Sequence, residues 1–233
     1  LYLAVIESGL NLSARSNVKA TGPWQFMSGT ARLFGLRVDW WIDERMDIVA
    51  STYAAAHYLK HLHGLFGSWQ LALASYNAGE YRVAHAVSRQ KTEDYWKLRL
   101  PSQTRWFVPK YMAALAIGRN PSAYGFDEPS GEPLEFDLVT VDQSTDLRLI
   151  AKAAGCTVMR IKNLNPALKR WATPPNSVID LKVPRGSGPD VAAALAGIPP
   201  GERVSWHRHR VKRGEALSRI AATYEISIRE LKK

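Results

Sequence analysis

The chain has 233 residues, of which 46% are hydrophobic and 22% charged, a globular composition that excludes a largely disordered protein. A single cysteine, Cys156, excludes an internal disulfide framework and any zinc site that needs two or more cysteine ligands. The formal charge of +10 favours a polyanionic partner, such as nucleic acid, acidic lipid or an anionic polymer, and no apolar run is long enough to predict a membrane span.

The first 125 residues predict a compact all-helical domain. Apolar residues recur at spacings of three and four, most clearly from Ile48 to Phe66, and Gly9 and Gly67 follow apolar runs, as is typical just past the end of a helix. The expected helices cover residues 3–9, 28–35, 43–67, 69–76, 83–87 and 101–118. Because the chain begins at Leu1, inside a helical pattern, we expect a fragment from which a signal peptide or lipid anchor could have been cut away.

A small module of mixed structure is expected next. Residues 126–137 are rich in turn formers and predict a linker. The patterns that follow predict a strand, two helices and a second strand, a β-α-α-β module over residues 138–185. The expected strands cover 138–141 and 178–183, and the helices between them cover 146–154 and 157–163.

The end of the chain repeats this module in a shortened form. After a second linker, residues 186–207, the segment 208–233 aligns without gaps to the earlier module when Val211 is placed over Val141. The apolar positions coincide because the same unit needs the same inward faces. The copy ends before its second strand would arrive, so we expect it to be marginally stable alone.

Three motifs of the helical domain predict an acid site that binds sugar. Glu7 follows an apolar run at a helix end, where desolvation raises the pKa of a carboxyl toward the range that a general acid needs. Gly22-Pro23-Trp24-Gln25-Phe26 and Ser75-Tyr76-Asn77-Ala78-Gly79 each combine aromatic rings with an amide, groups that stack on sugar rings and hydrogen-bond to them. Taken singly, Glu7 could instead cap a helix on the surface, and the aromatic rings could lie in the core.

The order of these motifs resembles the family 1 lytic transglycosylases, the goose-lysozyme-like enzymes of the cell wall, and within them the membrane-bound lytic murein transglycosylase type D branch. Residues 138–184 and 209–233 resemble LysM modules, which bind glycans that contain N-acetylglucosamine. The matching residues of the helical domain are Ile6-Glu7-Ser8-Gly9, 22–26, 47–52, 75–79 and the run from Pro101 to Lys110.

The resemblance implies an α+β multidomain protein. An all-α lysozyme-like catalytic domain at 1–125 would precede small βααβ LysM-like modules, a degenerate one at 138–185 and a truncated one at 208–233. Weak sugar-binding modules on flexible linkers would keep the catalytic domain close to an insoluble substrate.

The resemblance also implies the chemistry. Glu7 would be the single catalytic acid/base, cleaving the bond between N-acetylmuramic acid and N-acetylglucosamine with formation of 1,6-anhydromuramoyl ends. Neither a metal nor another cofactor is expected for this reaction. The substrate-binding residues implied by the resemblance and the motifs are Ser16, Gln25, Phe26, Tyr76 and Asn77.

Three positions depart from the family pattern. Lys19 stands where glycine is usual, and Gln103 replaces a frequent glutamate. Phe107 stands where many members have a tyrosine whose hydroxyl approaches the catalytic carboxyl. Loss of that hydrogen bond would raise the pKa of Glu7, since the bond favours the anion.

The remaining acidic residues, histidines and tryptophans of the helical domain have other expected roles. Glu80 is the second carboxylate within the motifs, whereas Asp43 and Asp47 are expected near a helix start for dipole reasons. The histidines of the long helix are expected to be solvated or hydrogen-bonded and not to hold a metal. We expect Trp40 and Trp41 to pack in the core and not to line the groove.

Competing functions remain open at this point. A goose-type muramidase would hydrolyse the same bond on the same fold, and a non-catalytic protein could have kept the groove for binding alone. A nucleic-acid-binding module is disfavoured, because the basic run from His207 to Arg213 belongs to no recognised nucleic-acid motif. We expect peptidoglycan strands as the partner and the periplasm or envelope of a bacterium as the location. The sequence leaves open whether an N-terminal anchor attaches the protein to the membrane.

Overall fold

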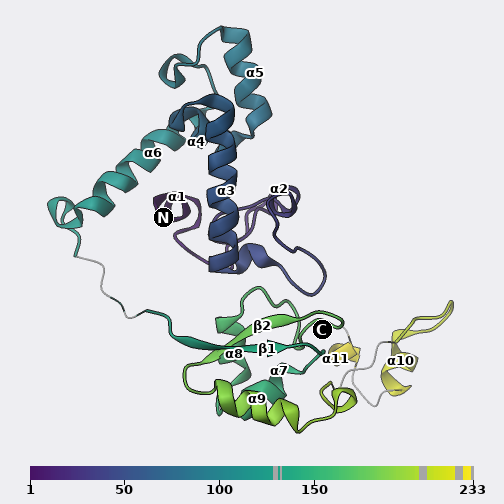
Figure 1. Ribbon diagram of the computed structural model, residues 1–233. Coiled ribbons are helices and arrows are strands. Elements are labelled where there is room, and N and C mark those ends of the chain that lie inside the picture. Colours follow the sequence, from purple (N-terminus) through teal and green to yellow (C-terminus); the bar gives the residue numbers. More distant parts are fainter. Residues whose placement is uncertain (128–130, 132, 205–208, 224–227, 232–233) are drawn as a thin grey trace.

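The computed structural model describes residues 1–127, 131, 133–204, 209–223 and 228–231. Its architecture is α+β, as predicted: a helical domain stands over a small module built on a two-stranded sheet, and a short helical segment follows (Figure 1). The helical domain contains α1 (Tyr2–Ser8), α2 (Ser28–Leu33), η1 (Glu44–Met46), α3 (Ile48–Phe66), α4 (Trp69–Ala78), α5 (Glu80–Gln90), η2 (Tyr95–Lys97), α6 (Ser102–Arg119) and η3 (Pro121–Tyr124), where η denotes a 3-10 turn.

The long helix α3 begins later than the sequence pattern predicts. Asp47 is its N-cap, and its carboxylate accepts hydrogen bonds from the N–H groups of Val49 and Ala50 at 2.9 and 3.0 Å. Asp43, expected among the charges of the helix start, lies before η1 instead. The first turn that Asp47 caps lies directly above the sheet-containing module, as Figure 1 shows for the lower end of α3.

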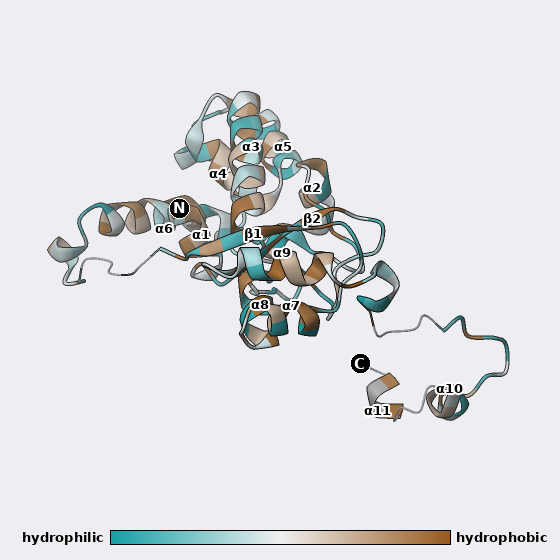
Figure 2. Ribbon diagram, turned by 60° about the horizontal axis from the view of Figure 1, so that its bottom comes forward, coloured by the Kyte–Doolittle hydropathy of each residue, from teal (hydrophilic) through white to brown (hydrophobic). Residues whose placement is uncertain are grey.

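The first module (residues 136–202) has the predicted strand and helix order, followed by a helix that the sequence pattern did not predict. Strands β1 and β2 are antiparallel, with Val139 opposite Leu181, and their inward side chains form one core with the helices. The interval 186–207, expected as a linker, contains α9, whose Val191 and Leu195 are buried in that core. Figure 2 shows α9 next to the strands of the module, with much of its ribbon in the brown of hydrophobic residues. Its elements are β1 (Phe136–Val141), α7 (Leu147–Ala153), α8 (Val158–Leu164), β2 (Ile179–Pro184), α9 (Gly188–Ala196) and η4 (Pro200–Glu202).

The first module is docked on the helical domain and is not held by a linker alone. The segment before α3 adds Ile42 to the apolar core of the module, where its side chain is only 5% exposed. Two backbone hydrogen bonds of 2.9 Å fix this contact, one from Asp43 N–H to the Ala167 carbonyl and one from Lys169 N–H to the Trp41 carbonyl. The expectation of a freely tethered module is therefore wrong for this first copy.

An ion pair between largely buried groups completes the junction. The Lys182 ammonium of β2 lies 2.7 Å from the Asp47 carboxylate, the N-cap of α3. Burial alone would raise the pKa of Asp47, but the bonds from Lys182 and from the Ala50 and Val49 N–H groups hold it below its ordinary value. The pair therefore ties the sheet of the module to the first turn of α3.

Replacing Lys182 by Met should loosen this junction, because the apolar stem is kept and the charge is lost. We expect a loss of about 2 kcal/mol in the free energy of unfolding at pH 7, measured by urea titration. The loss should shrink as the pH falls through the folded-state pKa of Asp47, which lies below the ordinary 3.8, because the wild-type carboxyl then also takes up a proton. The exposed Lys152 provides the control: if Lys152→Met costs as much, the pair has no special weight.

The two tryptophans before α3 also belong to the junction. Trp41 packs against the core of the first module, and Trp40 is 58% exposed with the Arg170 guanidinium 3.6 Å from its ring centre. The expectation of core packing is thus wrong for Trp40. Trp41 does pack against a core, but that core belongs to a module distant in the sequence.

The last described segment contains α10 (Leu217–Thr223) and α11 (Ile228–Leu231). Its apolar contacts include the buried Ile220 and Ala221. His207 and Arg208 of the basic run, and residues 224–227 of the repeat, lie outside the described residues. Of the helices in the described part of the chain, none combines the length and the apolar composition that a membrane span needs.

Candidate active site

Glu7 lies at the C-terminal end of α1, directly before the residue that turns the chain away. Gly9 adopts a left-handed conformation with φ of 62°, and its N–H bonds the Val5 carbonyl at 2.9 Å, which ends the helix. Ser8 donates a hydrogen bond of 2.8 Å to the Pro23 carbonyl, so the end of α1 is fixed against the 22–26 turn. Burial of the Glu7 carboxyl raises its pKa from 4.5 to about 7.

The turn at residues 22–26 has a backbone that only particular residues allow. Gly22 has a φ of 84°, and a Cβ at this position would lie 1.8 Å from the Arg45 carbonyl oxygen. Gln25 also has a positive φ, 49°, and its side-chain amide donates to the Gly22 carbonyl at 2.8 Å and to the Ala14 carbonyl at 3.3 Å. The turn thus places Gln25 rigidly beside the end of α1.

Ser16 lies in the loop that leads into this turn. Its hydroxyl oxygen accepts a hydrogen bond of 3.0 Å from the Ala20 N–H, and its backbone N–H bonds the Ala20 carbonyl at 2.9 Å. Because the oxygen accepts, the hydroxyl proton is still available as a donor. Lys19, inside the same loop, has a φ of 66°. The left-handed backbone of the family glycine is therefore present here with a lysine side chain, at a cost of about 1 kcal/mol.

Tyr76 joins the turn to the acid. Its hydroxyl, on α4, donates a hydrogen bond of 2.8 Å to the Trp24 carbonyl. Burial raises the pKa of Tyr76 well above its ordinary value, and the nearby Glu7 carboxylate raises it further. The phenol therefore stays protonated beside Glu7, where it can donate a hydrogen bond but cannot act as a base.

Phe26 is buried beneath these groups. It is 2% exposed, and its ring lies 6.1 Å from Tyr76 and 6.2 Å from Tyr58, centre to centre. A ring so placed supports Tyr76 from the interior of the domain and has no free face for a sugar. The expectation that Phe26 binds substrate is therefore wrong, because Phe26 is a core residue of the helical domain.

Asn77 connects α4 to α6. Its Oδ1 accepts a hydrogen bond of 3.1 Å from the buried hydroxyl of Thr104. Gly79, with a φ of 87°, follows and allows α5 to leave in a new direction. The described structure therefore holds the 22–26 turn between the end of α1, through Ser8, and Tyr76, which lies near Glu7. Asn77 lies at the end of the same helix as Tyr76.

Comparisons with known proteins match successive segments of the chain to described families. A family model described as "Transglycosylase SLT domain" matches residues 1–99, "Lytic transglycosylase MltD, LysM-like domain" matches 135–200, and "LysM domain" matches 209–233. Membrane-bound lytic murein transglycosylase D of Escherichia coli K12 is 30% identical over 249 aligned positions, which cover 100% of this chain and 55% of that protein. The chain is homologous to membrane-bound lytic murein transglycosylase D. It spans about half the length of the curated relatives that it matches.

Two further relatives extend the comparison. The protein of the same name from Escherichia coli O6:H1, strain CFT073, shows the same 30% identity over 100% of this chain and 55% of its own length. Among solved structures, the 70 kDa soluble lytic transglycosylase SLT70 from Escherichia coli aligns with a TM-score of 0.42 and 24% identity, over 55% of this chain and 22% of that chain.

Arg45 is a structural residue of the helical domain that sequence reasoning missed. It is 6% exposed, and its guanidinium makes two bonds of 2.8 Å to the Asp43 carboxylate. Its Nη1 donates to the carbonyls of Lys19 at 3.1 Å and Phe26 at 2.9 Å, the two ends of the turn that carries Gln25. Since the Asp43 N–H bonds the first module, Arg45 links the docked module to the wall of the site.

Glu80, the alternative carboxylate, has a defined partner. It accepts a hydrogen bond of 3.0 Å from the hydroxyl of Tyr58 on α3. Burial first, and then the charge of Glu80, raises the pKa of Tyr58. Tyr58 was also missed from the sequence, although it follows Ala54 and Ala55 on the buried face of α3 at helical spacing.

Two of the three histidines of α3 pack against aromatic rings, and His57 is exposed. His61 lies 5.9 Å from the ring of Phe34, and His63 lies 4.2 Å from the ring of Trp69. Within the part of the chain that the structure describes, no three side chains of His, Cys, Asp or Glu gather as a metal site would require.

Proposed function

We propose that this protein is a peptidoglycan lytic transglycosylase. It cleaves the β-1,4 bond between N-acetylmuramic acid and N-acetylglucosamine and leaves 1,6-anhydromuramoyl ends. The observation that carries the proposal is the Glu7 carboxyl, which is largely shielded from water, has a pKa of about 7 and lies near Tyr76. The homology to murein transglycosylase D supports it.

The mechanism needs one acid that becomes a base. Protonated Glu7 gives its proton to the glycosidic oxygen as the bond from that oxygen to C1 of the muramoyl ring breaks, and the acetamido group of the same sugar assists. The Glu7 carboxylate then takes the proton of the C6 hydroxyl, whose oxygen bonds C1. A pKa near neutrality suits both transfers, and holding O6 close to C1 replaces an attacking water.

The other groups position the sugar. Because the amide nitrogen of Gln25 is already bonded to two backbone carbonyls, we assign its Oε1 to the acetamido N–H or a hydroxyl of the substrate. Ser16 supplies a hydroxyl donor, and Asn77 supplies amide donors from the end of α4. Tyr76 donates to the Trp24 carbonyl and keeps the turn against Glu7.

Product analysis tests the proposal directly. Purified sacculi are digested with the protein, and the released muropeptides are weighed by mass spectrometry. We expect ends that are one water lighter than reducing ends. Reducing ends alone would identify a goose-type muramidase, and undigested sacculi would identify a non-catalytic binding protein.

The location and partners follow from the substrate. We propose that the protein acts on glycan strands in the bacterial cell envelope, and that the LysM segment at 209–233 adds affinity for them. We also propose that the protein is attached to a membrane, as the names of these relatives state for them.

A further inference from the structure

A cleft of about 340 Å³ opens between η2 and the first half of α6. Its floor includes the buried Tyr95 and Leu98, and its sides are Trp96 and Trp106, which are 60% and 61% exposed. Arg105 and Pro109 complete the lining. Two large aromatic side chains that face water across one cleft are unusual on a soluble domain and mark a binding surface.

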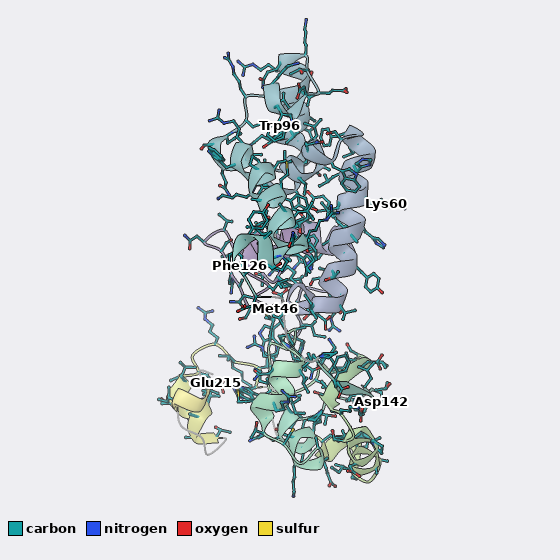
Figure 3. The ribbon with its side chains drawn as sticks, turned by 90° about the vertical axis from the view of Figure 1, so that its left-hand side faces the viewer. Met46, Lys60, Trp96, Phe126, Asp142 and Glu215 are labelled. Atoms are coloured by element: carbon teal, nitrogen blue, oxygen red, sulfur yellow. The ribbon has the colours of Figure 1, made fainter. Side chains whose placement is uncertain are left out.

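This cleft is separate from the candidate active site. Residues of an α-helix advance by about 100° each, so Arg105, Trp106 and Pro109 lie on the side of α6 opposite to Thr104 and Phe107. Those two residues are buried, and Thr104 bonds Asn77 of the site. Figure 3 shows Trp96 at the end of the helical domain that is remote from Met46 at the junction and from Asp142 of the first module.

The walls of the cleft are held in place before any ligand arrives. The Tyr95 hydroxyl donates to the carbonyls of Thr104 at 3.1 Å and Arg105 at 2.9 Å, which fixes η2 against α6. The backbone N–H of Trp96 donates a hydrogen bond of 3.0 Å to the Asp94 carboxylate. The Trp96 ring packs edge-on against Tyr95, with ring centres 5.0 Å apart. A preformed cleft loses little conformational entropy on binding.

The chemistry of the lining selects a sugar that carries an acidic substituent. Indole rings stack on the apolar faces of pyranose rings, and a cleft of this volume is at the lower limit of ligand sites, enough for one sugar unit. Among the described residues no carboxylate pairs with the Arg105 guanidinium, while the neighbouring Lys97 pairs with Asp94. A guanidinium without a carboxylate partner can bind the carboxylate of a ligand, the group that muramoyl residues and their stem peptides carry.

We propose that this cleft is a secondary binding site for peptidoglycan strands, in which one sugar lies between Trp96 and Trp106 and its acidic substituent meets Arg105. The proposal rests on the proposed function for the identity of the ligand. It places a strand contact at the far end of the helical domain from the first module. The protein would then hold a strand at a point away from the one it cleaves.

The test uses the full chain with Glu7→Gln, so that binding is measured without digestion. Sacculi are sedimented with this protein and with forms that also carry Trp96→Ala and Trp106→Ala, and the bound fraction gives Kd. We expect about tenfold weaker binding for the double variant and a smaller loss for Arg105→Gln. Tyr81→Ala, which removes another exposed ring of the same domain, is the control and should bind as the parent does.

A second measurement separates this site from catalysis. In the chain with Glu7 intact, the Trp96 and Trp106 substitutions should leave turnover of short soluble glycan fragments within about twofold, and turnover of sacculi should fall. Unchanged sedimentation would overturn the proposal, and so would an equal fall in both activities. A parent dimer that the substitutions convert to a monomer would also overturn it, since the cleft would then bind a second copy. Should Trp106→Ala fail to fold, Trp96→Ala with Arg105→Gln gives the same comparison, because both side chains are exposed.

Discussion

Glu7→Gln should abolish turnover of sacculi while leaving binding to them nearly unchanged. An amide occupies the volume of the carboxyl and cannot deliver or accept the proton that both steps need. General acid catalysis contributes about 10² to 10⁴ in rate, and because one group acts twice we expect a loss of at least about 10³-fold. Muropeptide release and sedimentation with sacculi measure the two quantities on the same protein.

Two glutamates serve as controls for that result. Glu93 is exposed, and Glu93→Gln should keep the parent activity. Glu80→Gln loses only the charge that accepts from Tyr58, so we expect activity within about tenfold of the parent. A loss for Glu80→Gln as large as that for Glu7→Gln would show that two carboxylates act, and the single-acid mechanism would then be wrong.

The same substitution should change stability with pH in a defined direction. Between pH 4.5 and 7 the unfolded chain releases the Glu7 proton, while the folded chain, with a pKa of about 7, retains it. Stability contributed by this group is therefore present below pH 4.5 and is lost as the pH rises through 7. Glu7→Gln should match the parent at pH 4 and exceed it at pH 8 by up to about 3 kcal/mol in urea titrations. Equal stability at both values would mean that the carboxyl is solvated.

The pH dependence of activity follows from the same pKa. Cleavage starts with the protonated acid, so turnover should fall as the pH rises above about 7.

Glu7 illustrates which features of the site can be predicted from the sequence: an acid placed after an apolar run predicts desolvation. Local periodicity likewise predicted α3, α6 and the βααβ order, because these features depend on neighbours within a few residues.

Features that depend on contacts between distant segments escaped prediction. The sequence predicts core packing for Trp40 and Trp41, but their environment is set by residues near Lys169 and Arg170 of the first module, more than a hundred residues away in the chain. Phe26 was assigned to the substrate, since an aromatic ring in a sugar-binding motif looks the same whether it faces outward or inward. Docking of the module could not be read from the turn-rich composition of 126–137, which describes the connection and not the surfaces that meet.

Arg45→Ala should be among the most damaging substitutions outside the acid itself. It leaves the buried Asp43 carboxylate without its partner. It also removes one of two donors from the carbonyls of Lys19 and Phe26, each of which keeps a hydrogen bond from Thr21. Breaking a buried pair from one side costs about 3 to 5 kcal/mol, and we expect a loss of this size in the free energy of unfolding. Arg37→Ala, the control, removes a half-exposed pair with Asp39 and a hydrogen bond of 3.2 Å to Ser177 of the first module, and it should cost less, about 1 kcal/mol.

Two further variants of Arg45 separate its charge from its geometry. Arg45→Lys keeps the charge but cannot make two parallel bonds to Asp43 and reach both carbonyls, so it should fall between the parent and Arg45→Ala. Asp43→Asn combined with Arg45→Met removes both charges and should recover part of the stability lost by Arg45→Ala, because no unpaired charge stays buried. For the variants that fold, turnover should be impaired for Arg45→Ala and Arg45→Lys through a higher KM, since the Gln25 turn is loosened while Glu7 is untouched. If Arg45→Ala proves as stable and as active as Arg37→Ala, the docked module does not support the wall of the site.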